Sequence, residues 1–376
     1  MPAIYATITV DWDGVNLDQN NLHWMRMFNR FFPGVPITHF ICPAYLTRTI
    51  LAAERVLLAA EINSVIKNID EVSLHIHCWY SLLAEAQVPS VATPTFYHND
   101  EIGPTAPWGA LPNGDAGHGV PLGYYSAPQI GQILQTGKRL LQGNQITNAN
   151  ADNAFLSFRC GGWLAGDKVL RAVRREGYLY EASGAPALYF SNIVWREPES
   201  RKLAEWVSSM WGCYQVPLPT YLENTWQQQF YPAGIAGLYP QSVATTPSNP
   251  KAMNGLLQVP DTGALADYVD ETSLQTYIDA ARAEVQAGRD AFISMGWHED
   301  SASWESPFHP GIANLQVIIN TLANNNNLHF LTVSESIQQW LALHTQAAPP
   351  LPPRLPFVVP EKLPAIPVTK RGLILG

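Results

Sequence analysis

Ile8-Thr9-Val10-Asp11-Trp12-Asp13-Gly14 is the stretch on which the predicted site of this chain converges. The preceding residues are β-branched and aromatic, and the Asp-Gly pair favours a turn, so residues 4–11 are predicted to form a strand that ends in a loop. Side chains alternate between the two faces of a strand, which places Asp11 and Asp13 on one face. Two neighbouring carboxylates are costly unless a cation or a proton compensates them. The stretch therefore predicts either a turn with two solvated aspartates or half of a polar site.

Composition excludes several classes of function. Hydrophobic residues make up 47% of the 376 residues, which is typical of a folded globular protein. The formal net charge is −9 and Lys/Arg runs are absent, which argues against a nucleic-acid or anionic-membrane partner. No apolar run approaches the roughly 18–20 residues that span a bilayer. No secretory signal is visible, so we expect a cytoplasmic protein, with export still open if a leader was removed. The oligomeric state is left open.

The hydrophobic pattern predicts alternating strands and helices. Strands are predicted at residues 4–11, 37–41, 72–77, 154–159, 178–181, 256–259, 291–295 and 328–332. Helices are predicted at residues 21–32, 47–67, 127–141, 167–176, 271–287, 312–322 and 334–343. About seven βα units with long irregular stretches at 85–125 and 184–255 indicate an α/β fold, a distorted (β/α)7-type barrel with long loops over the carboxyl ends of the strands. Residues 1–345 form the predicted domain, and 346–376 a Pro-rich tail without a catalytic group.

A second polar motif is Ser73-Leu74-His75-Ile76-His77-Cys78-Trp79. On a strand, His75 and His77 lie on one face while Leu74 and Ile76 lie on the other. Two imidazoles placed in this way can bind one Zn²⁺, and a carboxylate can complete a three-ligand site. Taken alone, a His-x-His pair is weak evidence, but the neighbouring aspartates strengthen it.

Two further strand ends carry candidate residues. Arg159 is followed by two glycines in Phe158-Arg159-Cys160-Gly161-Gly162-Trp163, which favours a guanidinium turned into a cleft, although a surface arginine in a glycine turn is the simpler alternative. His298 lies just beyond a late predicted strand, on the same edge of a parallel sheet as the earlier groups.

These motifs resemble those of the polysaccharide deacetylase superfamily, of the carbohydrate esterase family 4 type, in order and placement. The matching stretches are residues 9–14, 71–77, 158–163, 177–183, 297–298 and 331–335, and the resemblance covers roughly residues 4–343. It implies a distorted (β/α) barrel, a divalent metal that is usually Zn²⁺, and hydrolysis of an acyl amide or ester.

The resemblance also implies a role for each matching residue. Asp11 would be the general base, Asp13 and His75 metal ligands, Arg159 the residue that orients the base, and His298 the general acid. The chain departs from the family pattern at two positions. Trp12 separates the two aspartates, and Trp79 stands where the motif has its second histidine. We expect His77 to be the second histidine ligand, with His98 and His118 of the 85–125 stretch as the alternatives.

Three functions are compatible with these motifs. The first is a metal-dependent deacetylase of an N- or O-acetylated sugar, in which tryptophans near the motifs stack on sugar rings, namely Trp12, Trp79, Trp163 and Trp297. Tryptophans in such numbers are also ordinary in cores and loops. The second is an amidohydrolase of a small cyclic amide or other non-sugar amide, which the long loops would suit. The third is a carbohydrate-binding protein on the same scaffold without catalysis. The expected partner is a small molecule or a carbohydrate in each case.

Overall fold

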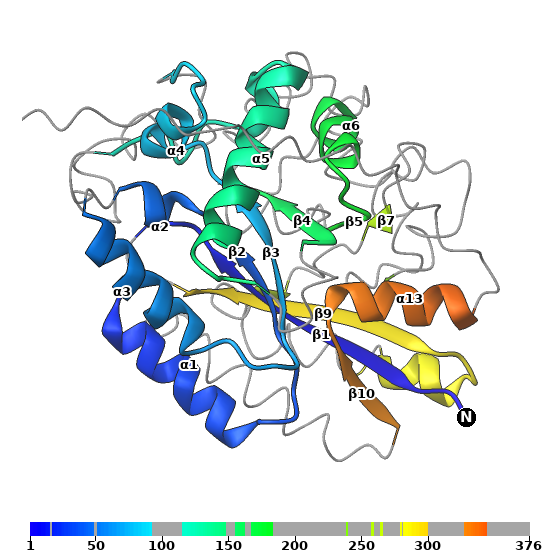
Figure 1. The fold of residues 1–376 in the computed structure, drawn as a ribbon. Coiled ribbons are helices and arrows are strands. Elements are labelled where there is room, and N and C mark those ends of the chain that lie inside the picture. Colours follow the sequence, from blue (N-terminus) through cyan, green and yellow to red (C-terminus); the bar gives the residue numbers. More distant parts are fainter. Residues whose placement is uncertain are drawn as a thin grey trace, which may run out of the picture.

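A sheet of ten strands organises the protein (Figure 1). The computed structural model describes residues 1–15, 17–48, 51–91, 115–147, 155–161, 167–182, 238–239, 257–258, 264–265, 279, 281–299 and 327–343. The strands are β1 (Ile4–Trp12), β2 (Thr38–Ile41), β3 (Glu71–Ile76), β4 (Ser157–Cys160), β5 (Tyr180–Glu181), β6 (Leu238–Tyr239), β7 (Leu257–Gln258), β8 (Ala264–Leu265), β9 (Ala291–His298) and β10 (Leu328–Leu331).

The strand order is that of a βα barrel wall. It runs β6-β9-β1-β2-β3-β4-β5-β7, with β10 paired to β1 and β8 paired to β9. Every described pairing is parallel except that of β6 with β9. From β1 to β5, successive strands are therefore neighbours, and helices connect them, as parallel strands require. The predicted α/β fold with a curved, barrel-like parallel sheet is confirmed.

Helices cover the outer face of the sheet, except for the last helix, Val333–Leu343, which packs against the inner face (Figure 1). They are α1 (Gln19–Phe31), α2 (Ala44–Thr47), α3 (Ala52–Asn63), α4 (Tyr80–Glu85), the 3₁₀ helix η3 (Leu122–Tyr124), α5 (Ala127–Gly143), α6 (Asp167–Arg175) and α13 (Val333–Leu343). The helix predicted at 47–67 was wrong in its first turns. Leu51 has an extended backbone, and α3 begins only after it. Helix 312–322 lies outside the described residues, as does most of 271–287, of which 281–286 are helical.

Strand alternation separates an apolar face from a polar one. On β1, Ile8, Val10 and Trp12 join the buried core formed with the α1 side chains Leu22 and Phe28. The alternate residues of β1 are Thr7, Thr9 and Asp11, and they are buried on the inner face of the sheet. The alternation of side chains along β1 therefore directs its apolar side chains to the helices and its polar side chains to the barrel interior.

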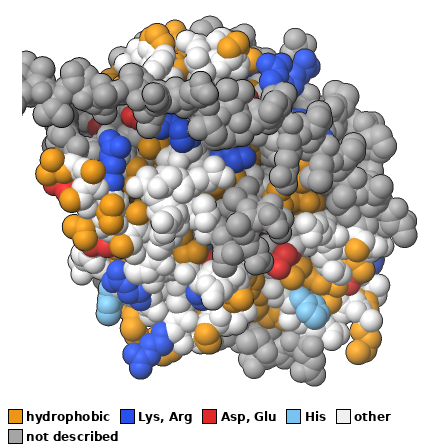
Figure 2. All heavy atoms as spheres, viewed as in Figure 1, with side chains coloured by type: hydrophobic (Ala, Val, Ile, Leu, Met, Phe, Trp, Pro, Cys, Tyr) orange, Lys and Arg blue, Asp and Glu red, His pale blue; other side chains and the backbone are white. Residues whose placement is uncertain are grey.

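One exposed surface departs from the amphipathic pattern. Val56 and Leu57 on α3 are both 65% exposed, and hydrophobic side chains gather over this helix in Figure 2. Only Ala59 and Ile62 of α3 are buried. None of the helices in the described part of the chain is long and apolar enough to cross a membrane.

The buried carboxylate of Glu71 holds the last helix, α13, against the interior of the barrel. Glu71, at the start of β3, accepts hydrogen bonds from the Ser334 backbone N–H (2.9 Å) and hydroxyl (2.7 Å), and from the Ser157 hydroxyl (2.5 Å). The Glu335 carboxylate accepts from the Thr332 backbone N–H at 2.9 Å, so Thr332 precedes the first turn of α13, which begins one residue before the predicted helix at 334–343.

We predict that Glu71→Gln lowers the free energy of unfolding by about 1–3 kcal/mol, because the amide replaces a charged acceptor and points an N–H₂ group at other donors. Denaturant unfolding of the two proteins measures the difference. Glu54→Gln, at an exposed position on α3, should stay within about 0.5 kcal/mol of the wild type. Equal losses in both variants would contradict this role for Glu71.

Candidate active site

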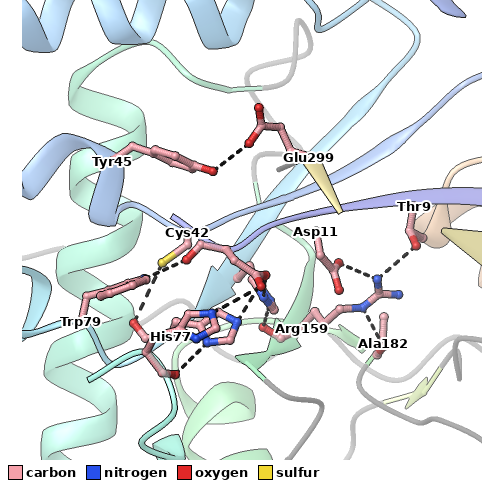
Figure 3. Close-up of polar contacts among 12 residues, drawn as sticks. Thr9, Asp11, Cys42, Tyr45, His77, Trp79, Arg159, Ala182 and Glu299 are labelled. Atoms are coloured by element: carbon pink, nitrogen blue, oxygen red, sulfur yellow. Dashed lines mark hydrogen bonds and ion pairs between the residues drawn. The ribbon is translucent and has the colours of Figure 1, made fainter. Parts of the chain in front are cut away.

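A buried ion pair joins β4 to β1. Arg159 Nη1 lies 2.6 Å from Asp11 Oδ1, and both side chains are 1% exposed. The same Nη1 donates to the Thr9 hydroxyl at 3.0 Å, and Nε donates to the Ala182 carbonyl at 2.9 Å (Figure 3). The guanidinium carbon lies 4.3 Å from the centre of the Phe40 ring. These contacts compensate a buried charge pair that would otherwise be costly, and they hold the Asp11 carboxylate in one orientation.

The second carboxylate, Asp13, lies among three imidazoles. Its Oδ1 is 3.1 Å from His75 Nε2 and 3.3 Å from His77 Nε2, and its Oδ2 is 3.4 Å from His118 Nε2. The His77 and His118 rings stack, with centroids 3.9 Å apart. The structure thus brings together the predicted ligands Asp13, His75 and His77 and adds His118, one of the two alternatives. His98, the other alternative, lies outside the described residues.

The hydrogen-bonding state of the histidines fits a bound cation. Nδ1 of His75 faces the Arg159 carbonyl at 3.1 Å, and Nδ1 of His77 faces the His118 carbonyl at 2.9 Å. A carbonyl only accepts hydrogen bonds, so each Nδ1 carries a proton, and a neutral ring in this orientation presents its Nε2 lone pair to Asp13. Lone pairs that face a carboxylate require a proton or a metal between them. Ligands at about 2.0–2.1 Å from a tetrahedral ion lie roughly 3.3 Å apart, close to the observed separations.

The ligand atoms of Asp13, His77 and His118 all lie within 4.8 Å of one another. His75 contacts Asp13 but is not in this mutually close set, so the geometry favours His118 over the predicted His75 as the third ligand beside Asp13 and His77. These nitrogen and oxygen donors suit zinc and other divalent transition metals, and they do not distinguish among those metals.

Burial and neighbouring groups favour the deprotonated forms of Asp13 and His118. Burial raises the pKa of Asp13, but the nearby charges of His77 and His298 and hydrogen bonds from His118 and His75 outweigh it and bring the pKa well below its usual range. Burial and then the charge of His77 lower the pKa of His118 to about 3, which keeps its imidazole neutral. Metal ligands must be deprotonated in this way.

The position of His77 depends on Gly161, which directly follows β4. A Cβ on Gly161 would lie 2.6 Å from the Ile76 carbonyl oxygen and 2.8 Å from His77 Nδ1. Such distances do not occur in folded proteins, so a side chain at position 161 would displace the imidazole. The glycine that follows Arg159-Cys160 is therefore required by the approach of the His77 ring.

His298 lies at the same end of the sheet. It is the register partner of Asp11 across the β1–β9 pair, and it is half-buried. Equivalent residues of neighbouring parallel strands point to the same face, so His298 and Asp11 share the inner side of the sheet.

Two of the four tryptophans expected to contact substrate do not face the site. Trp12 and Trp297 are fully buried, Trp12 beside Tyr45 and Trp297 beside Phe28. They alternate with Asp11 and His298 along their strands, which turns them towards the helical layer. The expectation for these two residues was wrong. Trp79 borders the site, because its indole N–H donates to the Asp13 carbonyl at 2.8 Å. Trp163 lies outside the described residues.

A buried relay that sequence reasoning missed holds Trp12 in place. The Trp12 indole N–H donates to His39 Nδ1 at 3.2 Å, and His39 Nε2 lies 3.2 Å from Asp70 Oδ2. The relay anchors the residue between Asp11 and Asp13 on the outer face. His39 shares its strand face with the core residues Ile37 and Ile41, and a lone histidine on an apolar face carries no signal of its partner.

We predict that the metal-free protein loses stability as the pH falls from about 6.5 towards 3. In this window the unfolded chain protonates His118 while the folded chain does not, so the unfolded state binds more protons and acid favours it. The lowered pKa of Asp13 acts in the same direction at the acid end. One proton corresponds to a slope of at most about 1.4 kcal/mol per pH unit.

Urea unfolding with chelator across this range measures the slope, which His118→Asn should reduce. His23→Asn, at an exposed position on α1, is the matched control and should leave the slope unchanged. A slope that survives in His118→Asn would contradict the assignment.

Comparisons with known proteins bear on the fold. No protein-family model matches this sequence, and no protein of curated function matches it. Among solved structures, a protein assigned as a polysaccharide deacetylase from Mycobacterium smegmatis is 10% identical, with a TM-score of 0.44 over 94% of each chain. Puue allantoinase is 11% identical, with a TM-score of 0.44 over 92% of each chain. A protein assigned as a polysaccharide deacetylase from Pseudomonas aeruginosa PAO1 is 11% identical, with a TM-score of 0.46 over 92% of this chain and 93% of that one. These likenesses concern the fold alone.

Proposed function

We propose that this chain is a metal-dependent hydrolase of an acyl amide or ester, with an acetylated sugar as the first substrate class to test. The observation that carries the proposal is the contrast between two carboxylates on one strand face. Asp11 is paired with a guanidinium, whereas Asp13 is surrounded by imidazoles. Acidic groups that are close together but placed in different environments are typical of sites that divide base and ligand roles between them.

The proposed roles follow from these environments. Asp13, His77 and either His75 or His118 would hold the cation, which when bound would supply Lewis-acid chemistry by making a water more acidic and stabilising negative charge on a carbonyl oxygen. Asp11 would take the proton from the attacking water. Arg159 would orient Asp11 through the 2.6 Å contact and hold it in place while the proton moves.

His298 would act as the general acid. A leaving amine or alkoxide must gain a proton as the bond to the acyl carbon breaks, and an imidazole can donate one near neutral pH. Its place across the β1–β9 pair from Asp11 puts the proposed acid and base on adjacent strands.

The support for a sugar substrate comes from the motifs, not from aromatic side chains. Trp12 and Trp297 are buried, and Trp79 is 2% exposed beneath the Arg48 guanidinium. These three tryptophans therefore offer no open face to a sugar ring. A panel of N- and O-acetylated sugars tested beside small cyclic amides would separate the two hydrolase functions, and bound sugar without turnover would indicate the binding protein.

We predict that Asp11→Asn keeps the metal and loses at least about a hundredfold in rate, because a general base typically contributes that much. Asp13→Asn should lose the metal as well. Elemental analysis and hydrolysis assays of purified protein measure both. Asp279→Asn is the control, since this carboxylate is 61% exposed. If Asp11→Asn loses the metal and Asp13→Asn retains it, the two roles are interchanged.

We also predict that the loss in rate of His298→Ala depends on the leaving group. A good leaving group, such as a nitrophenolate, departs without a proton, so the variant should lose roughly 100-fold or more on an alkyl ester or amide and much less on an aryl ester. Rates on the two substrates measure the difference. An equal loss on both would argue that His298 does not act as the acid.

A further inference from the structure

Of the three histidines around Asp13, only His118 lies outside a strand or its immediate extension. His75 lies on β3 and His77 directly follows it, whereas His118 follows Asp115, Ala116 and Gly117 in the segment before η3. A side chain on such a segment keeps its position only if the segment is bound to the rest of the fold. The contacts of residues 115–118 therefore decide whether His118 can serve as a ligand.

Asp115 is the most strongly bonded residue of this segment. Its Oδ2 accepts from Arg48 Nε at 2.9 Å and from the Ser81 hydroxyl at 2.7 Å. Its Oδ1 accepts from the Ser81 backbone N–H at 3.1 Å and from the Ala116 backbone N–H at 3.0 Å. The carboxylate is 5% exposed, so these four charge-assisted bonds form in a largely water-free setting, where such bonds are strong.

Each following residue is also fixed against the chain that leaves β3. The Tyr80 backbone N–H donates to the Ala116 carbonyl at 2.8 Å, and His77 Nδ1 donates to the His118 carbonyl at 2.9 Å. Gly117 has φ +95°, and a Cβ there would collide with the Cys78 carbonyl oxygen. The segment thus lies against residues 77–81 with no room for a side chain at position 117.

Arg48 connects this segment to Asp13. Its Nη1 donates to the Val15 carbonyl, and its guanidinium carbon lies 3.8 Å from the centre of the Trp79 ring. The Trp79 indole in turn donates to the Asp13 carbonyl at 2.8 Å. Asp115 and the backbone of Asp13 are therefore held on the same guanidinium–indole pair.

We propose that Asp115 is a positioning residue for the metal site, which acts by docking the segment that carries His118 onto α2 and α4 and so delivers His118 as a ligand. This proposal rests on the proposed function, because it assumes that the Asp13 site binds a metal. The segment would supply the imidazole that this chain lacks at position 79, where Trp79 stands in place of the second histidine of the family motif. Loss of a group that orients a ligand typically weakens metal binding by 10–100-fold.

The test is the zinc affinity of the full chain, measured by competition with a chromogenic chelator after the purified protein is stripped of metal. We expect Asp115→Asn and Asp115→Ala to bind zinc about 10–100-fold more weakly than the wild type. Ser81→Ala, which removes one donor to Asp115, should show a smaller loss and keeps the test informative if an Asp115 variant does not fold. Glu85→Gln removes the half-exposed α4 ion pair with Arg139 and should bind as the wild type does.

A double-mutant cycle with His118→Ala separates positioning from a general loss of structure. If Asp115 acts through His118, Asp115→Asn should cause no further loss of zinc affinity once His118 is absent, while circular dichroism of the metal-free variants stays that of the wild type. Wild-type affinity in the Asp115 and Ser81 variants, or additive losses in the cycle, would overturn this proposal alone. A wild-type chain that binds no zinc would refute the proposed metal-dependent function, and this proposal with it.

Discussion

The ion pair between Arg159 and Asp11 is the contact on which the geometry of the site depends. In the sheet, β4 is separated from β1 by β2 and β3, so the guanidinium crosses the barrel interior over the Phe40 ring to reach its partner. Removing either member would leave the other charge buried and uncompensated, which proteins rarely tolerate. The pair therefore ties two distant strand ends together. His75 of β3 donates a hydrogen bond to the Arg159 carbonyl, so β4 also holds this imidazole in place.

The two aspartates of β1 owe their different environments to the residue between them. Trp12 points to the outer face, where His39 and Asp70 hold its indole. With Trp12 held on the outer face, Asp11 and Asp13 both point into the interior. Asp11 contacts Arg159 there, and Asp13 contacts the imidazoles. A tryptophan between the aspartates therefore does not disrupt the site, because His39 and Asp70 bind its indole N–H on the outer side of the sheet.

Local pattern explains which features could be predicted from the sequence. The period of two on β1 and β3 placed Asp11 with Asp13 and His75 with His77, and the alternation of strands and helices predicted the parallel sheet. The same alternation directs Trp12 and Trp297 away from the site, because each is adjacent in sequence to a residue that points into it. The sequence identified His118 only as one of two alternative ligands, because its place depends on the contact of Asp115 with Arg48, a residue 67 positions earlier in the chain.

The pairing of β1 also has a consequence for biosynthesis. Its register partners on β9 and β10 begin at residues 291 and 328, so the first strand of the chain is bordered by two of the last. A ribosome that adds about 5–20 residues per second takes roughly 15–60 s to synthesise the intervening chain. During that time one edge of β1 has no partner strand on the nascent chain, which makes chaperone binding to this segment advantageous. Contacts so distant in sequence also predict slow folding.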